Sequence, residues 1–373
     1  MSHRKKNTAL LLGSTKAAYR PSLWAAYFME RSQDYGLIVD TCDFGSRLPR
    51  VVRVILRVVF TIFAYMVSDI VVIQPMTHVT FYSRMVYRLN RYFRKKIIVD
   101  VYISSFETMI VDRKKFRDDS VEAMKLKRRD CLAFLAGNPT IFLTAAERSY
   151  YSKILDIGED SLHSTVRPLV VPDRPLANRP YLSGESQRPT IAWWGREGNP
   201  LHGFENIAEA CRILLENGFD GSFAFFASGG KNWDEFQEKF SFLKEHPNVL
   251  FSKDYSFNNG KLTEYLLENT DLAFGTFGNT KKAQTVLVNK VLDAASFGIP
   301  CLTQESSGLK EYFNEGETIL ISDTKPSEIA NAILLAFSEP EKLSAIGNRA
   351  RDLMKSEFSQ TKFSEDLDRM FRQ

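Results

Sequence analysis

Short apolar runs alternate with helix-length segments along nearly the whole chain, and this alternation constrains the fold more than any other feature. A short apolar run bounded by turn residues is typical of a strand buried on both faces, and strands that alternate with helices form parallel sheets. The expected strands cover residues 8–12, 36–40, 69–74, 96–102, 140–144, 166–171, 190–194, 221–227, 248–252, 271–275, 300–303 and 318–321. We therefore expect an α/β protein with doubly wound parallel sheets.

One stretch without this pattern divides the chain. Residues 172–189 contain four prolines and no hydrophobic period, which is typical of a linker. We expect an N-terminal Rossmann-like domain over 1–173, a linker over 174–189 and a C-terminal Rossmann-like domain over 190–373. A final helix often packs back on the first domain in such arrangements. Ligands of these sheets bind outside the carboxyl ends of the strands, so the two domains are expected to face a central cleft.

Charge is distributed unevenly between the two halves. Residues 1–173 hold 27 Lys and Arg against 17 Asp and Glu, whereas residues 174–373 hold 22 against 28. A basic half suits nucleic acid, anionic lipid or phosphorylated substrates, and charge alone does not choose among them. Arg84, Arg88 and Arg91 have helical spacing but no nucleic-acid recognition module accompanies them. We therefore expect an anionic membrane surface as partner and no nucleic acid, with a solvated charged helix as the alternative.

Residues 51–67 form an apolar segment that contains Arg53 and Arg57. A spanning helix needs about 20 apolar residues, and an arginine near its centre costs about 2.5–3.5 kcal/mol on insertion scales. The segment is therefore not expected to span a membrane. Two interpretations stay open, a core helix whose arginines extend to solvent and an interfacial helix that lies on lipid.

The four cysteines stand far apart, which indicates free thiols in a reducing compartment. The N-terminus has a basic head and a short apolar run without a small-residue cleavage site, so we interpret it as a first strand and not as a signal peptide. The five histidines are dispersed and have no metal-ligand spacing with cysteine, so no metal is expected. These features favour a cytoplasmic protein, peripheral on the inner face of the cell membrane.

Two loops of the second half have residues suited to phosphate. The segment 191–203 contains Gly195, Gly198 and Gly203, which allow close backbone approach, and Arg196, whose guanidinium can bind phosphate. Its spacing is neither a Walker loop nor a dinucleotide-binding fingerprint, so a structural turn is an equal alternative.

The second loop lies between residues 272 and 300. It contains Gly278, Lys282 and Lys290, with both lysines around the expected start of a helix, where an anion is favoured. Asp293 lies three residues after Lys290 and thus on the same helix face, where it could accept hydrogen bonds from ribose hydroxyls. The alternative is a surface Lys–Asp pair beside an ordinary loop.

In the first half, hydroxyl and carboxylate residues follow an expected strand. Asp100, Ser104 and Thr108 could orient a sugar or act on an acceptor hydroxyl. The alternative is helix capping by Ser104 or Ser105. Gly13 and Ser14 follow the first strand and are turn residues that could contact an acceptor.

Together, these segments resemble the GT-B glycosyltransferases of family 4 type, in particular bacterial enzymes of surface polysaccharide synthesis. Residues 289–303, NKVLDAASFGIPCLT, are similar to that family's N-K-V, acidic residue and A-x-x-x-G-x-P pattern. Residues 275–283, GTFGNTKKA, and 201–203, LHG, are similar to segments of one subgroup. Residues 99–108, VDVYISSFET, with Asp112 and Arg113 resemble a block of its N-terminal domain.

The resemblance implies transfer of a sugar from a nucleotide-diphosphate donor to a glycan or lipid-linked acceptor, with retention of configuration. UDP- or GDP-linked donors are favoured, and no cofactor or metal is implied. Arg196 and Lys290 would neutralise the diphosphate and Asp293 would bind ribose. His202, Gly203 and the loop 275–282 would lie against the donor.

Two positions depart from the family pattern. Thr285 stands where the first of two acidic residues is usual, and His202 replaces the usual lysine. The alternatives to a transferase are a GT-B protein that binds nucleotide or glycan without transferring it, and a sugar-nucleotide epimerase.

Overall fold

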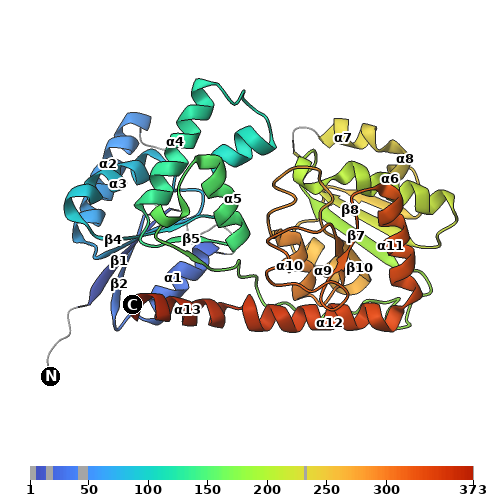
Figure 1. Cartoon of the computed structure of the whole chain (residues 1–373). Coiled ribbons are helices and arrows are strands. Elements are labelled where there is room, and N and C mark those ends of the chain that lie inside the picture. Colours follow the sequence, from blue (N-terminus) through green and yellow to red (C-terminus); the bar gives the residue numbers. More distant parts are fainter. Residues whose placement is uncertain (1–5, 14–19, 41–48, 231–232, 373) are drawn as a thin grey trace. The chain divides into compact units, whose positions relative to one another are not determined.

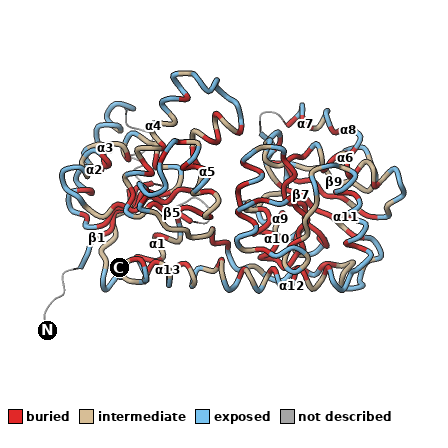
Figure 2. The backbone as a smooth tube through the Cα atoms, in the orientation of Figure 1, coloured by how far each residue is buried: buried red, intermediate tan, exposed pale blue. Residues whose placement is uncertain are grey.

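The computed structural model describes residues 6–13, 20–40, 49–230 and 233–372. It forms two compact units, the first comprising Met1–Val170 with Phe363–Gln373 and the second Val171–Lys362 (Figure 1). Buried residues concentrate on the strands of each unit (Figure 2).

Unit 1 contains a six-stranded parallel sheet in the order β2-β1-β3-β4-β5-β6. The strands are β1 (Asn7–Leu12), β2 (Tyr35–Asp40), β3 (Ile70–Ile73), β4 (Lys96–Asp100), β5 (Thr140–Phe142) and β6 (Ser164–Val166). Helices α2 (Arg50–Val67), α3 (Phe81–Phe93), α4 (Val121–Ala136) and α5 (Ala145–Leu155) contribute to the core on one face of this sheet. A π-helix, η1 (Glu107–Asp112), and a short 3-10 helix, η2 (Glu159–Ser161), complete the connections. Because both faces are covered, the central strands have continuous apolar runs, such as residues 9–12 and 70–73, in place of an alternating pattern.

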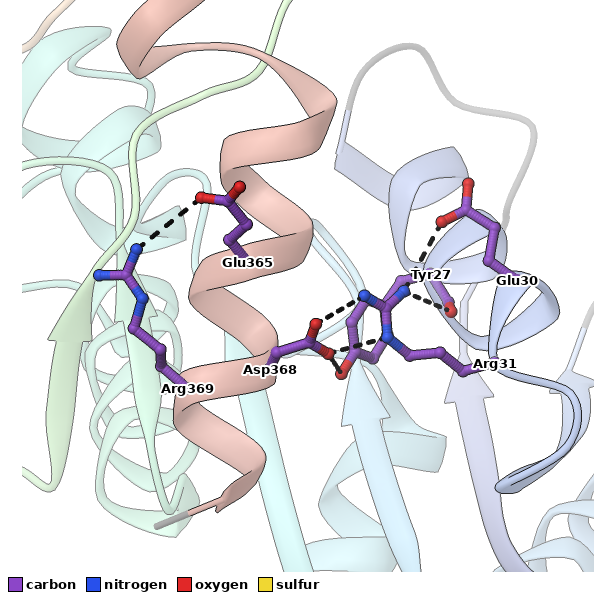
Figure 3. A network of polar contacts seen from close by, with 6 residues as sticks. All are labelled: Tyr27, Glu30, Arg31, Glu365, Asp368 and Arg369. Atoms are coloured by element: carbon purple, nitrogen blue, oxygen red, sulfur yellow. Dashed lines mark hydrogen bonds and ion pairs between the residues drawn. The ribbon is translucent and has the colours of Figure 1, made fainter.

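The other face of the sheet is covered by α1 (Arg20–Glu30) and by the end of the C-terminal helix α13 (Gln360–Arg372). Figure 3 shows the polar contacts that join these two helices. Arg31 donates to both carboxylate oxygens of Asp368 at 2.8 Å, and the Tyr27 hydroxyl donates to the same carboxylate at 2.9 Å. The Arg31 guanidinium also lies 4.1 Å from the centre of the Tyr27 ring. The last helix thus belongs to unit 1.

Unit 2 contains a second parallel sheet in the order β12-β11-β10-β7-β8-β9. The strands are β7 (Thr190–Gly195), β8 (Ser222–Ala227), β9 (Val249–Ser252), β10 (Leu272–Phe274), β11 (Cys301–Thr303) and β12 (Leu320–Ile321). The helices are η3 (Pro200–His202), α6 (Phe204–Glu216), α7 (Trp233–Lys239), α8 (Ser241–Lys244), α9 (Lys261–Asn269), α10 (Asn289–Ser296), α11 (Pro326–Ser338) and α12 (Pro340–Glu357).

The strand at the end of unit 1 differs from its expected position at 166–171. It occupies Ser164–Val166 and stops there, because Pro168 has no N–H to donate to a neighbouring strand. The carbonyls of Arg167 and Pro168 instead accept hydrogen bonds from Arg20, at 2.8 and 2.5 Å. The observed strand shares only Val166 with the expected run, and the other eleven strands overlap theirs more fully.

The proline-rich segment 172–189 is hydrogen-bonded to unit 2, whereas a flexible linker would make few such contacts. It packs on unit 2 through backbone hydrogen bonds from Ala177 to Phe297, at 2.8 Å, and from Asn178 to Leu267, at 2.7 Å. The carboxylate of buried Asp271 accepts from the backbone of Tyr181 at 2.8 Å. Prolines prevent strand pairing here, but the remaining backbone groups still bond to the unit.

Candidate functional site

The strand order of unit 2 identifies where a ligand would bind. From β7 the chain adds β8 and β9 along one direction of the sheet, and it then returns to add β10, β11 and β12 along the other. The strand order therefore reverses between the neighbouring strands β7 and β10. Open α/β sheets bind ligands at this point, beside the carboxyl ends of the strands. The loop after β7 and the loop after β10 meet there, next to α10 (Figure 1).

These two loops touch backbone to backbone. The backbone N–H of Phe277 donates to the carbonyl of His202 at 3.0 Å. The side-chain amide of Asn206, on α6, donates to the carbonyl of Phe277 at 2.9 Å. Gly203 has φ of +58°, and a Cβ there would overlap the carbonyl of Phe277. A Cβ at Gly278 would likewise overlap the carbonyl of Pro200. Both glycines are thus required for packing between the loops. This packing explains the two glycines more specifically than a need for space beside a ligand.

Trp193 of β7 brings two of the expected donor-binding residues together. The ammonium of Lys290, at the start of α10, lies 4.3 Å from the ring centre of Trp193. The His202 ring packs edge-on against the same indole, with centroids 5.7 Å apart. The carbonyl of Arg196 can only accept a hydrogen bond, so its 3.2 Å contact with His202 places the imidazole proton on Nδ1.

Lys290 is the most perturbed group of the site. Its side chain is buried, and its ammonium has no hydrogen-bond partner among the described residues. Burial lowers its pKa well below the usual lysine range, and only weaker attraction from Cys301 and Asp293 opposes this. A buried ammonium without an anion is costly, so the site is prepared for a negatively charged group. This environment does not fit the alternative of a surface Lys–Asp pair.

The other expected residues lie in the same region with different exposure. Asp293 and Lys282 are both buried, whereas Arg196 is exposed on the loop after β7. Thr285 is also buried, and its hydroxyl donates to the carbonyl of Lys281 at 2.8 Å. The position where the family has an acid therefore serves the local turn in this chain.

Glu197 is a residue of this region that the sequence analysis missed. Its carboxylate accepts from the Ser228 hydroxyl at 2.7 Å and from the backbone N–H of Gly230, which joins the loop after β8 to the loop after β7. Burial raises its pKa, but the hydrogen bonds from Ser228 and Gly230 outweigh this and lower the pKa below the usual range. The available signal was an acidic residue within the glycine-rich loop that ends β7.

In unit 1, Asp100 faces the interior. It forms an ion pair with Arg20 at 3.0 Å, both side chains have no exposed surface, and Trp24 donates to the same oxygen at 2.7 Å. A carboxylate held in this way is unsuited to contact an acceptor. The arrangement favours a structural role for Asp100 over the expected catalytic one.

Ser104 and Thr108 are also buried, before and within η1. The Ser104 hydroxyl accepts from the N–H of Glu107 at 3.0 Å and donates to Asp130 at 2.6 Å. Thr108 donates to the Glu107 carboxylate at 3.2 Å. These contacts match the capping alternative for Ser104.

Gly13 has φ of +129°, and a Cβ there would overlap the Thr77 hydroxyl, so this glycine serves the contact between the loops after β1 and β3. Ser14 lies outside the described residues. Within the described part of the chain, no three His, Cys, Asp or Glu side chains are grouped as metal ligands. The three cysteines that the structure describes, Cys131, Cys211 and Cys301, are free thiols.

Comparisons with known proteins agree with this architecture. Residues 226–367 match the family described as glycosyl transferase-like. HepE of Anabaena, solved with UDP and glucose, is similar with a TM-score of 0.66 at 13% identity, covering 98% of this chain and 99% of that one. Sucrose-phosphate synthase of Thermosynechococcus elongatus has a TM-score of 0.72 at 11% identity, with 98% of both chains covered.

A glycosyltransferase of Rickettsia africae has a TM-score of 0.64 at 14% identity, again with 98% of both chains covered. A search of curated proteins gave no match. The expectation of two Rossmann-like domains with the GT-B fold is confirmed. The family match, which covers most of unit 2, supports a glycosyltransferase of this fold.

Proposed function

We propose that this protein is a retaining glycosyltransferase that moves a sugar from a nucleotide-diphosphate donor to a glycan or lipid-linked acceptor. The fold, the family match over 226–367 and the neighbour that holds UDP and glucose support this proposal. UDP- and GDP-linked donors are the first to test, and cell-surface polysaccharide synthesis at the cytoplasmic side of the membrane is the proposed context.

The observation that carries the proposal is the buried ammonium of Lys290 at the β7/β10 switch point. A diphosphate placed there would supply the anion that this lysine lacks among the described residues. The leaving diphosphate gains negative charge as the glycosidic bond breaks, so a preorganised cation stabilises the transition state more than the ground state. Arg196 on the adjoining loop would add a second cation.

The remaining residues of unit 2 would orient the donor. Asp293 follows Lys290 by one helical turn and would accept hydrogen bonds from the ribose. Lys282 and the loop around Gly278 would lie along the donor, and the imidazole of His202 would contribute a hydrogen bond. We propose that these cations meet the charge requirement without a metal or cofactor.

The acceptor would bind unit 1 at the carboxyl edge of its sheet, where the loops after β1, β3 and β4 begin. Gly13 follows β1 at this edge, and Ser14, the next residue of the sequence, is proposed with it as an acceptor contact although it lies outside the described residues. Ser104 and Thr108 would act there as positioning residues, because their hydroxyls hold the turn that opens η1.

The first test measures thermal stabilisation by UDP, GDP, ADP and CMP. A ligand at 100 times its Kd adds about 2.7 kcal/mol, which raises the unfolding midpoint by several degrees. The shift should be lost in Lys290→Met and retained in Lys355→Met, a matched control because Lys355 is an exposed lysine in the last turn of α12, outside the loops of the donor site. Equal shifts in both variants would contradict the donor site.

Product analysis then separates the alternatives. Donor and acceptor together should give a glycosylated product with the anomeric configuration of the donor. An altered donor sugar formed without acceptor would indicate an epimerase. Nucleotide binding with no product under either condition would favour the non-catalytic alternative, with Thr285 in place of the acid as its structural basis.

A further inference from the structure

Helix α2 presents an apolar face to solvent. Of its 18 residues, ten apolar side chains have more than a third of their surface exposed, including Val51 at 70%, Phe63 at 61%, Val59 at 60% and Ile55 at 56%. The others are Val52, Val54, Leu56, Ile62, Met66 and Val67. Figure 2 shows much of this helix as exposed. Contiguous apolar surface of this kind marks an interaction site.

Thr61, Tyr65 and the partly buried Arg57 lie on the protein side of α2, whereas most of its apolar side chains are exposed, the reverse of a helix on a soluble domain. Thr61 is buried and donates to the carbonyl of Arg57 at 2.8 Å. The Arg57 guanidinium lies 4.2 Å from the ring centre of Tyr82 and 3.9 Å from the carboxylate of buried Asp40. These contacts fix the rotation of α2 and leave its apolar side outward. Ala64 and Tyr65 belong to the core, but Arg57 contacts Asp40 and Tyr82 where the core-helix interpretation of residues 51–67 has the arginines extend to solvent. The exposed apolar face favours the interfacial interpretation and needs an occupant.

Unpaired arginines lie in the same helical layer. Arg84, Arg88 and Arg91 follow one face of α3. Burial lowers the pKa of Arg84, and the nearby positive charges of Arg129 on α4 and of Arg88 lower it further. Within the described ranges, none of these four arginines forms an ion pair with a carboxylate. Mutual repulsion without anionic partners indicates that the anions come from outside the protein.

The apolar and cationic surfaces are held together by packing between the helices. The Tyr65 hydroxyl of α2 donates to Asn90 of α3 at 2.7 Å, and the rings of Tyr65 and Phe93 are 6.1 Å apart. Helices α2, α3 and α4 share one core on one face of the sheet. Tyr92 of α3 is 84% exposed and adds an aromatic side chain suited to a membrane interface.

We propose that unit 1 binds the surface of an anionic membrane through α2 and α3. Among the described residues, no helix has both the length and the apolarity to cross a bilayer. Helix α2 would lie in the plane of the interface with its apolar side chains at the headgroup and acyl boundary, while the arginines of α3 bind lipid phosphates. A second copy of this chain is a poorer occupant, because a twofold interface would bring unpaired arginines of both copies together.

The test uses the full chain and sedimentation with large vesicles, either pure phosphatidylcholine or a mixture with 30% phosphatidylglycerol as the anionic lipid. Binding is expected to require the anionic lipid and to weaken as salt is raised, because surface charges are screened. Equal binding to neutral vesicles, or no binding to either, would overturn the proposal. Light scattering of the free protein tests the second-copy alternative, which a dimer that dissociates in Ile55→Asp would support.

Two variants separate the apolar and cationic contributions. Ile55→Asp/Phe63→Asp should reduce vesicle partitioning by at least about tenfold, because burying one such side chain alone is worth that factor. The matched control is Leu334→Asp/Leu335→Asp, which introduces the same charges at side chains 49% and 63% exposed on α11. Unchanged binding in the α2 variant, or an equal loss in the control, would overturn the role of α2.

For the arginines, Arg88→Gln/Arg91→Gln should reduce partitioning by about fivefold per residue and make it less sensitive to salt. Lys342→Gln/Lys355→Gln on α12 removes the same charge from another exposed helix and should leave partitioning nearly unchanged. Nucleotide stabilisation is measured on all variants and should be retained, so failure of membrane binding and failure of the donor site are distinguishable. Full binding of the arginine variant would contradict the headgroup contacts.

Discussion

Replacing Asp100 with asparagine tests whether this residue supports the fold or the chemistry. Asp100 and Arg20 have no exposed surface, and the guanidinium already uses its other donors on the carbonyls of Arg167 and Pro168. Removing one charge of a buried pair costs about 3–5 kcal/mol because the other charge stays desolvated. Asparagine keeps an acceptor for Trp24, so we expect about 3 kcal/mol. For a unit of this size the unfolding midpoint would fall by about 6–12 °C.

The assay is thermal and urea unfolding, together with sugar transfer measured well below the midpoint. Asp119→Asn is the control, because its pair with Arg117 is 3.0 Å long but 70% and 84% exposed, and surface pairs contribute at most about 1 kcal/mol. The double variant Arg20→Met/Asp100→Leu should be more stable than Arg20→Met alone, in which the buried carboxylate keeps its charge without the guanidinium. An Asp100→Asn protein with unchanged stability and no transfer would refute the structural assignment.

Three further predictions concern single side chains. Gly203→Ala should destabilise unit 2 by more than Gly198→Ala in urea unfolding. Both glycines have positive φ, but only at Gly203 would a Cβ meet a backbone group, the carbonyl of Phe277. Equal losses of unfolding free energy in the two variants would contradict the loop packing. Burial lowers the pKa of Lys290 and a bound diphosphate would raise it, so nucleotide binding should take up a proton at this residue. In the free protein, the unfolding free energy should rise with pH between the lowered pKa and the ordinary lysine value, because the unfolded chain binds more protons there. Calorimetry in two buffers at a series of pH values below the ordinary lysine pKa measures the uptake, and its absence at every pH would argue against contact with the diphosphate. Asp368→Ala should cost about 1–2 kcal/mol by removing the acceptor of three hydrogen bonds between α1 and α13, and a stability unchanged in thermal unfolding would show that the apolar contacts of α13 suffice.

The strands were predictable because their apolar runs are short, continuous and bounded by turn residues, so burial on both faces is encoded locally. The misplaced run at 166–171 shows the limit of this reasoning. Its residues are apolar enough for a strand, and Val170 is indeed buried, but Arg20, almost 150 residues earlier, takes its carbonyls. Pro168 was a local signal that the strand ends early, whereas the long-range hydrogen bonds from Arg20 have no local signature.

The site divides in a similar way. Glycines and cations after β7 and β10 were visible as candidates, because phosphate recognition requires flexible backbone and positive charge. Their individual roles were not visible. Gly203 and Gly278 resemble ligand-binding glycines in sequence, yet each faces the backbone of the other loop. The importance of Lys290 depends on the indole of Trp193, which lies about one hundred residues earlier.

The order of the elements, the division into two α/β units and the loops that hold candidate donor residues could all be predicted from the amino-acid sequence. These follow from local periodicity and residue chemistry. The ion pair that encloses Asp100, the burial of Lys290 and the outward apolar side of α2 became known only from the folded chain. Each depends on which distant residue lies opposite, and a periodic pattern identifies an apolar face without showing what covers it.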